Sequence, residues 1–325
     1  MSNVLELRDL SIAYGSTPVL NSVNLTVREG EVVALLGPSG SGKSTLLNAV
    51  AGFLPINSGE VLLAGRNVAA PGHTEPPERR DIAFVFQDYG LWPHLTAIDT
   101  VAYPLRRRGV RPAPARDQAR AILERLGIGP LVDRKPAQLS GGEQQRVGLA
   151  RAMAREAALY LFDEPTAHLD AQVRDVFLAE LAARRRESGT AAIYATHDAA
   201  EALGLADRVA LLIGGRVIQK GSPQQLYAEP VSVEAARLTG PASLLNDDAM
   251  GRVLVRPDWV RFGGDRTGVV VDVWFRGSYT DYVLRTSDGE LLLRTPAPPA
   301  HRRGEELSWS LDRCWPLPDA DAASD

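Results

Sequence analysis

The residues best suited to chemistry lie close together, between positions 37 and 45. They are Gly37, Pro38, Ser39, Gly40, Ser41, Gly42, Lys43, Ser44 and Thr45. This order fits G-x-x-x-x-G-K-[S/T], a loop whose backbone N–H groups surround a polyphosphate while its lysine reaches the terminal phosphates and its hydroxyl helps to hold Mg²⁺. Residues 31–36 form a short apolar run typical of a buried strand, and the residues after the loop have helical spacing. This context favours a phosphate-binding loop over a Gly/Ser surface loop.

Polar side chains also follow three other apolar runs that predict buried strands. Gln87 follows the run at 81–86, Asp163 and Glu164 follow the run at 158–162, and His197 follows the run at 191–195. Open α/β sheets bind ligands at the carboxyl ends of their strands. Two adjacent carboxylates there need an ionic or polar partner. Beside a phosphate-binding loop, Asp163 is suited to Mg²⁺ and Glu164 to accepting a proton from water.

A second candidate anion site lies at the start of a predicted long helix. Ser140 and Glu143 have capping-box spacing, and Gly141 and Gly142 between them allow another group to approach the helix N-terminus closely. A well-capped helix without a ligand explains the same residues about equally well. Tyr14 lies between two predicted strands, where a turn or core aromatic is the simpler interpretation.

Composition limits the class of protein. The 325 residues carry a formal charge of −4 and a pI near 5.8, which argues against general affinity for nucleic acid. The single cysteine, Cys314, allows no intrachain disulfide, and no apolar run is long enough to cross a bilayer. The N-terminal residues do not match a signal peptide. We therefore expect a cytoplasmic location.

The type of predicted secondary structure changes near residue 240. Helices are predicted at 96–108 and 115–127, and the apolar residues 91–95 suggest a contact surface. After residue 240, strand-like segments near 252–262, 269–276, 279–286 and 290–294 predict a small β-barrel. Its core is expected to contain four tryptophans, Trp259, Trp274, Trp309 and Trp315.

Together these motifs resemble the nucleotide-binding subunit of an ABC transporter. The resemblance covers residues 1 to about 238 and rests on the phosphate-binding loop, Gln87, the segment Leu-Ser-Gly-Gly-Glu-Gln-Gln-Arg at 139–146, Asp163-Glu164 and His197, in the family's order. It implies an α/β P-loop NTPase with a RecA-like core, an antiparallel β subdomain and a helical subdomain. Residues 239–325 are similar to a TOBE domain, a small all-β barrel, followed by an acidic tail.

The resemblance implies a role for each residue of one composite ATP site. ATP and Mg²⁺ are the implied cofactors, with Ser44, Gln87 and Asp163 at the metal, Glu164 as general base, and His197, Gln87 and Lys43 at the reacting phosphate. Tyr14 is implied to stack on adenine, which reverses the simpler interpretation. Ser140 and Gly142, with Gly141 and Glu143 beside them, would grip the γ-phosphate held by a second subunit. Asp170 keeps the family pattern, whereas His168 replaces a small residue.

The implied function is an ATPase that drives a membrane importer. A homodimer would act with integral-membrane permease subunits, and indirectly with an extracytoplasmic solute-binding protein, at the cytoplasmic face of the cell membrane. Residues 255–258 resemble a TOBE segment, and residues 87–96 resemble those of importers of iron(III), polyamines, thiamine or related solutes. No nucleic-acid partner is expected. The alternatives are a soluble ABC ATPase acting on nucleic acid or the ribosome, and a regulatory ATP-binding module with little turnover.

Overall fold

The computed structural model describes residues 2–166, 171–247, 251–296 and 298–317. The chain forms two compact units, Met1–Lys220 and Gly221–Asp325. By their contacts, helices α7 (Pro223–Ala228) and α8 (Val233–Thr239) belong to the second unit, whereas the sequence places a boundary after residue 238. The predicted boundary after residue 238, between the ATPase domain and the TOBE-like domain, stays a prediction. No helix in the described part of the chain is both long and apolar enough to cross a membrane.

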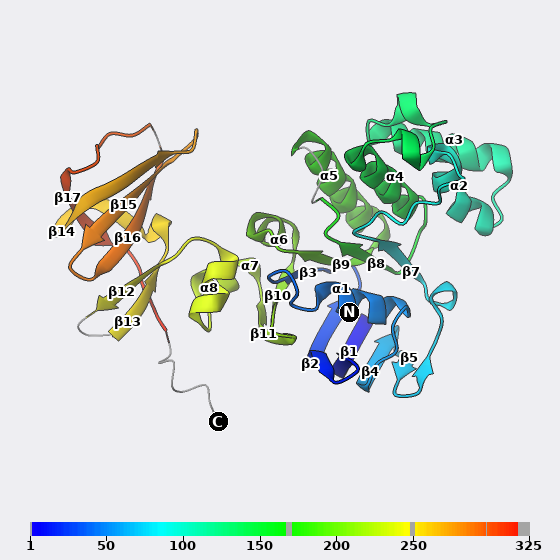
Figure 1. Cartoon of the computed structure of the whole chain (residues 1–325), viewed down its shortest axis with the longest axis horizontal. Helices are drawn as coiled ribbons and strands as arrows, with labels where there is room; N and C mark the ends of the chain where they lie inside the picture. The colour runs from blue at the N-terminus through cyan, green and yellow to red at the C-terminus, as the bar shows by residue number, and fades with distance from the viewer. Residues whose placement is uncertain (1, 167–170, 248–250, 297, 318–325) are drawn as a thin grey trace. The chain divides into compact units, whose positions relative to one another are not determined.

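A six-stranded sheet lies at the centre of the first unit (Figure 1). Its strands follow the order β11 (Arg216–Gly221), β10 (Arg208–Ile213), β3 (Val32–Leu36), β9 (Ala191–Thr196), β8 (Leu159–Asp163) and β7 (Ile82–Val85). The strands from β10 to β7 pair in parallel. All residues of β3, β8 and β9 are buried, as the continuous apolar runs predict. The carboxyl ends of β3, β9, β8 and β7 therefore meet at one edge.

An antiparallel sheet shares a core with this parallel sheet. Its order is β2 (Thr17–Arg28), β1 (Asn3–Tyr14), β4 (Ser58–Leu63), β5 (Arg66–Ala70) and β6 (His73–Thr74). Alternate residues of β1 and β2 are buried, so one face of this sheet contacts the core. The same core includes the apolar face of α1 (Lys43–Ala51), the helix that follows the phosphate-binding loop. The antiparallel subdomain is thus present as expected.

The other helices of the first unit pack mainly against a second core. They are α2 (Ala97–Arg107), α3 (Pro112–Arg125), α4 (Gly141–Met153), α5 (Ala171–Ser188) and α6 (Ala199–Leu205), with short 3-10 turns η1 (Pro77–Arg79), η2 (Gly129–Leu131) and η3 (Pro136–Gln138). Helices α2, α3 and α4 contact one another and form the helical subdomain (Figure 1). The sequence predicts that the third helix starts at residue 115, but Pro112 is its first residue. A proline at this position loses no hydrogen bond, because the first helical N–H has no partner within the helix.

The second unit contains two antiparallel sheets around one core. One sheet has the order β12 (Ser243–Asp247), β13 (Gly251–Val255) and β18 (Trp315–Pro316), and the other β16 (Gly289–Thr295), β15 (Thr280–Thr286), β14 (Val260–Phe275) and β17 (Glu306–Leu311); the turn η4 (Pro257–Trp259) precedes β14. Trp259 and Trp309 are buried, as predicted. The prediction for Trp274 is wrong, because its side chain is 42% exposed near the end of the long strand β14.

A buried arginine secures the C-terminal end of α1. Arg80 is 1% exposed and donates to the carbonyls of Ala49 and Val50, at 3.0 and 2.6 Å. It also donates to the carbonyls of Val68 and Glu75, at 3.0 and 2.9 Å. Burial lowers the pKa of Arg80, but all its contacts are to oxygens that a cation favours. Arg80 therefore ties the phosphate-loop helix to the antiparallel sheet.

Arg80→Met should lower the free energy of unfolding of the first unit by about 3 kcal/mol, because it leaves several buried carbonyls without a donor. Urea unfolding followed by tryptophan fluorescence and circular dichroism measures the change. Arg79→Met is the matched control, because Arg79 directly precedes Arg80 and its side chain is exposed. Equal effects of the two substitutions would contradict this role for Arg80.

Candidate functional site

The phosphate-binding loop connects the central strand β3 to helix α1. Gly40 and Gly42 have φ angles of 79° and 103°, a region that disfavours side chains. Gly37 is required for another reason: a Cβ there would lie 2.2 Å from the carbonyl oxygen of Leu212. The Ser41 hydroxyl is buried and has no hydrogen-bond partner among the described residues. The loop thus presents backbone and hydroxyl donors before a helix N-terminus, which suits a polyphosphate.

Lys43 and Glu164 come together from the segments that follow β3 and β8, the strands on either side of β9. Lys43 is 5% exposed, and its Nζ donates to the carbonyls of Gly37 and Pro38, at 2.9 and 3.1 Å. The same atom lies 3.5 Å from Oε1 of Glu164. His197 approaches the other oxygen of this carboxylate, with 3.2 Å between Nδ1 and Oε2. The sequence predicts all three residues at this edge, and the structure joins them in one cluster.

Glu164 has an unusual backbone conformation. Its φ is 47°, in the left-handed region that residues with a side chain rarely adopt. Such a conformation costs about 1–3 kcal/mol and persists where the surrounding structure imposes it. The Glu164 N–H donates to the carbonyl of Ala195 in β9, at 3.0 Å. The turn after β8 is thus attached to the strand that carries His197.

Ser44 and Asp163 form a pair suited to Mg²⁺. The Ser44 hydroxyl donates to Oδ1 of Asp163 at 3.1 Å, and Asp163 is 4% exposed. Burial raises the pKa of Asp163, and the neighbouring Glu164 charge adds to this, whereas Ser44 and Lys43 oppose it. A hydroxyl and a carboxylate oxygen beside phosphates are the usual protein ligands of Mg²⁺. No group of three His, Cys, Asp or Glu able to hold a metal occurs in the described residues.

Gln87 and Tyr14 lie in regions that fit their expected roles without contacting the cluster. Gln87 is exposed after the edge strand β7, next to β8 in the sheet, and forms no hydrogen bond within the described ranges. Tyr14 ends β1 and its ring is 53% exposed. The following strand β2 passes the loop closely, because a Cβ on Gly42 would lie 2.6 Å from Cδ2 of Leu20. An open aromatic face therefore lies on the hairpin beside the phosphate-binding loop.

The predicted capping box is present at the start of α4. The Ser140 hydroxyl accepts from the Glu143 N–H at 3.4 Å, and the Glu143 carboxylate accepts from the Ser140 N–H at 2.7 Å. These hydrogen bonds lower the pKa of Glu143. Gly141, which is exposed, and Gly142, which is partly exposed, follow Ser140 in the first turn. No hydrogen bond or ion pair among the described residues links this turn to Lys43. His168 and Asp170 lie outside the described residues.

Sequence reasoning missed a carboxylate network behind the cluster. Glu201 in α6 accepts hydrogen bonds from Thr166, Tyr194 and Thr196. Gln145 in α4 also reaches the turn after Glu164, donating to the carbonyl of Pro165 at 2.6 Å. Burial, followed by the charge of Glu201, raises the pKa of Tyr194. The only signal in the sequence is that Glu201 is polar and follows His197 by one helical turn.

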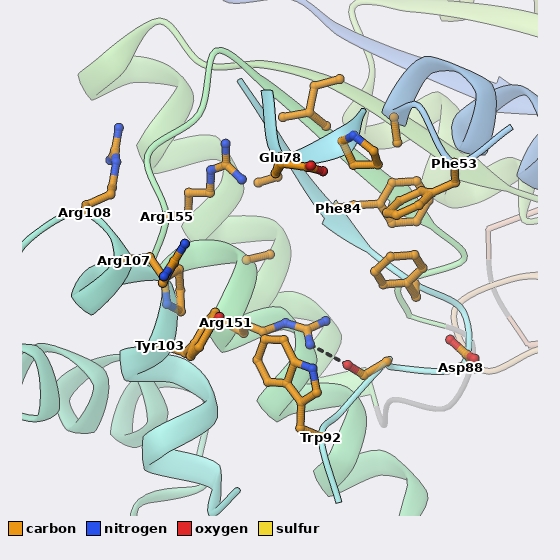
Figure 2. Close-up of a pocket in the computed structure, with 18 residues that line it drawn as sticks. Phe53, Glu78, Phe84, Asp88, Trp92, Tyr103, Arg107, Arg108, Arg151 and Arg155 are labelled. Atoms are coloured by element: carbon orange, nitrogen blue, oxygen red, sulfur yellow. Dashed lines mark hydrogen bonds between the residues drawn. The ribbon is translucent and has the colours of Figure 1, made fainter. Parts of the chain in front are cut away.

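Sequence reasoning also missed a cavity of about 860 Å³ away from the cluster (Figure 2). Figure 2 shows Phe53 and Phe84 at one end of it, Arg107, Arg108 and Arg155 at the other, and Trp92 beside Arg151. The Phe84 ring lies 5.9 Å from Phe53 and 4.3 Å from Phe86, between centroids. The remaining lining includes Glu78, Asp88, Trp92, Tyr103, Arg107, Arg108, Arg151 and Arg155. Trp92 belongs to the apolar segment predicted as a contact surface. Arg107 and Arg108 are exposed and border this cavity.

Arg151 fixes the loop that follows Gln87. Its guanidinium donates to the carbonyls of Gly90, at 2.5 Å, and Tyr89, at 3.1 Å. The guanidinium carbon also lies 5.3 Å from the centroid of the Trp92 ring. Burial lowers the pKa of Arg151. Helix α4, which begins at the capping box, is therefore attached to the wall of the cavity.

Comparison with known proteins identifies both units. The ABC transporter family matches residues 20–167, and the TOBE domain family matches residues 253–317. The chain is 43% identical to an sn-glycerol-3-phosphate import ATP-binding protein of Rhizobium johnstonii over 76% of this chain and 70% of the relative. It is 36% identical to a spermidine/putrescine import ATP-binding protein of Frankia alni over 96% of this chain and 78% of the relative.

A solved structure resembles the first part of the chain. It is a dimeric ATP-binding cassette in a post-hydrolysis state with ADP and Pi, with a TM-score of 0.61 and 32% identity over 67% of this chain and 98% of that one. The sequence prediction of a P-loop ATPase followed by an all-β TOBE-type domain is confirmed. This chain belongs to the ABC transporter family of ATP-binding proteins.

Proposed function

We propose that this chain is the ATP-binding and ATP-hydrolysing subunit of a multi-subunit ABC importer for a small solute. The main support for this proposal is that Lys43, Glu164 and His197 lie together at the end of the phosphate-binding loop. Ser44 and Asp163 form a hydrogen-bonded pair beside them. This grouping supplies the parts that phosphoryl transfer needs: positive charge, a metal site and a base. The import function of the relatives supports the direction of transport.

In the proposed reaction, water attacks the γ-phosphorus of ATP and the bond to the β-phosphate oxygen breaks. Backbone donors of residues 37–45 and the Lys43 ammonium hold the phosphates, and Tyr14 stacks on adenine. Glu164 accepts the proton of the attacking water, and His197 contacts the γ-phosphate. Ser44, Asp163 and Gln87 would hold Mg²⁺, which neutralises charge on the β- and γ-phosphates.

The proposed active form is a head-to-tail homodimer. Ser140 and Gly142 of one subunit, with Gly141 and Glu143 in the same turn, would bind the γ-phosphate held by the other subunit. This accounts for an exposed, fully capped helix N-terminus that has no described link to the phosphate loop of its own chain. Asp170, which keeps the family pattern, is proposed as a further nucleotide-binding residue. ATP then closes the dimer, and hydrolysis releases it.

The cavity bounded by Phe53, Phe84 and Trp92 supports a docking surface for a permease subunit. It combines exposed aromatic surface with the charged residues Arg107 and Arg108 on one side, as helix-binding grooves commonly do (Figure 2). Gln87 lies between Phe86 and Asp88, which both line this cavity, so a movement at the γ-phosphate that Gln87 senses would reach the docked partner. Such a complex would lie at the cytoplasmic face of the membrane.

The permease and the solute-binding protein would select the transported solute. Iron(III), polyamines and thiamine are the expected classes of solute.

ATP turnover by the full chain, with and without the permease encoded beside its gene, tests this function. Phe53→Asp should lower permease-stimulated turnover by about tenfold, because it places a charge in an apolar contact while leaving the ATP site intact. Phe275→Asp in the second unit is the matched control, since both rings are about half exposed, 48% and 55%. Fast turnover by the isolated chain that responds to DNA or ribosomes, and not to the permease, would contradict the importer function.

A further inference from the structure

The carboxylate of Glu201 joins segments that are far apart in sequence. Its Oε1 accepts from the Thr166 hydroxyl at 2.6 Å, and its Oε2 accepts from Tyr194 and Thr196, at 3.0 and 3.1 Å. The Glu201 side chain is 9% exposed, and Arg174 approaches it at 3.9 Å. An ionised carboxylate only accepts hydrogen bonds, so it can satisfy all three hydroxyls at once. Glu201 is therefore the shared acceptor of the network.

Two of these hydroxyls belong to the segments that carry the proposed chemistry. Thr166 is 6% exposed and follows Glu164 by two residues, whereas Thr196 is 3% exposed and directly precedes His197. The Thr196 hydroxyl also accepts from the Asp198 N–H at 3.0 Å. The backbone carbonyl of Thr196 accepts from the Gly37 N–H at 3.4 Å. A single carboxylate is thus hydrogen-bonded both to the turn that follows β8 and to the end of β9, and β9 is hydrogen-bonded to the start of the phosphate loop.

The left-handed conformation of Glu164 needs such an attachment. On its N-terminal side, Asp163 continues strand β8, and the Glu164 N–H is bonded to Ala195. On its C-terminal side, the hydrogen bond from Thr166 to Glu201 fixes the chain two residues after Glu164, and strained conformations persist where the surrounding structure fixes both sides. In this conformation the Glu164 carboxylate reaches both Lys43 and His197.

We propose that Glu201 is a positioning residue for ATP hydrolysis: through Thr166 and Thr196 it fixes Glu164 and His197 relative to each other. This inference rests on the proposed function. Glu201 itself contacts neither Lys43 nor the phosphate loop in the described structure, and the two threonines connect it to the segments that carry Glu164 and His197. Displacing a base or a phosphate ligand by about 1 Å is enough to slow a reaction about a hundredfold.

Thr166→Val in the full chain tests the inference, because valine keeps the shape and removes only the hydroxyl. We expect kcat for Mg-ATP to fall about tenfold or more, with the Kd for ATP nearly unchanged. Thr166→Ser keeps the hydroxyl and should restore kcat. Thr100→Val is the matched control: Thr100 is 1% exposed in α2, and its hydroxyl has no hydrogen-bond partner within the described part of the chain. It should leave kcat at the level of the unmodified protein.

A double-mutant cycle shows whether the effect passes through Glu164. In a Glu164→Gln background, Thr166→Val should slow hydrolysis little further. Glu201→Gln, which replaces one acceptor oxygen by a donor, should reproduce the loss of kcat in the unmodified background. Equal kcat for Thr166→Val and Thr100→Val would overturn the inference, and so would an equal loss in both backgrounds. Loss of folded structure in both Thr166→Val and Glu201→Gln, but not in Thr100→Val, would assign the network to stability and also overturn it.

The same experiments separate this inference from the proposed function. A full chain without Mg-dependent ATPase activity, or with normal activity after Glu164→Gln, would remove the proposed function. A chain that is slowed by Glu164→Gln but not by Thr166→Val would keep that function and remove only the positioning role of Glu201.

Discussion

Glu164→Gln is expected to slow ATP hydrolysis by a factor on the order of 10² or more while ATP binding persists. Glutamine keeps the size of the side chain and an oxygen that can contact water, but it cannot accept a proton at neutral pH. The carboxylate lies beside both Lys43 and His197, where the terminal phosphate is expected. The variant should therefore bind ATP and remain in the closed dimer, because the ATP that joins the subunits is not consumed.

Single-turnover hydrolysis and size-exclusion chromatography with Mg-ATP measure these two effects. The loss should appear in the chemical step, and the dimer peak should increase relative to the unmodified chain. Glu124→Gln is the matched control, because Glu124 is exposed in α3 and the substitution makes the same change of charge. Normal hydrolysis by Glu164→Gln would show that another group, or no protein base, accepts the proton.

Lys43→Ala is expected to weaken ATP binding by a factor on the order of 10² or more, because it removes a cation aimed at the terminal phosphates. The Lys43 ammonium is held by the carbonyls of Gly37 and Pro38, so its direction is set by the loop itself. Its loss also leaves the Glu164 carboxylate without its nearest cation in the described structure. That unscreened negative charge would further oppose a triphosphate.

Isothermal titration with ATP, in the presence of Mg²⁺, measures the change in Kd. Lys220→Ala is the control, since Lys220 is exposed in β11 and makes no described contact with the loop. A Kd close to that of the unmodified chain, together with normal turnover, would remove Lys43 from the phosphate site. Unchanged affinity with lost turnover would instead confine Lys43 to stabilising charge in the transition state.

The sequence alone predicts that Lys43, Glu164 and His197 lie at one edge of the parallel sheet, where the structure places them in contact. Apolar runs locate the strands that end at Leu36 and Asp163, and parallel strands present their carboxyl ends at one edge. The loop after Leu36 and the capping box at Ser140 are local features, governed by residues within a few positions of each other. Such features depend on short-range geometry, so the pattern of residue types is enough to predict them.

Only the tertiary structure determined the contacts between those elements. The contact between Lys43 and Glu164 and the carboxylate network of Glu201 both join residues that are distant in sequence. The cavity that brings Phe53 beside Phe84, and the exposure of Trp274, likewise depend on how whole strands pack. A residue type specifies what a side chain can bind, and periodicity specifies which face it occupies. Its actual partner is set by the packing of segments that no local pattern relates, which is why Glu201 was not recognised from the sequence.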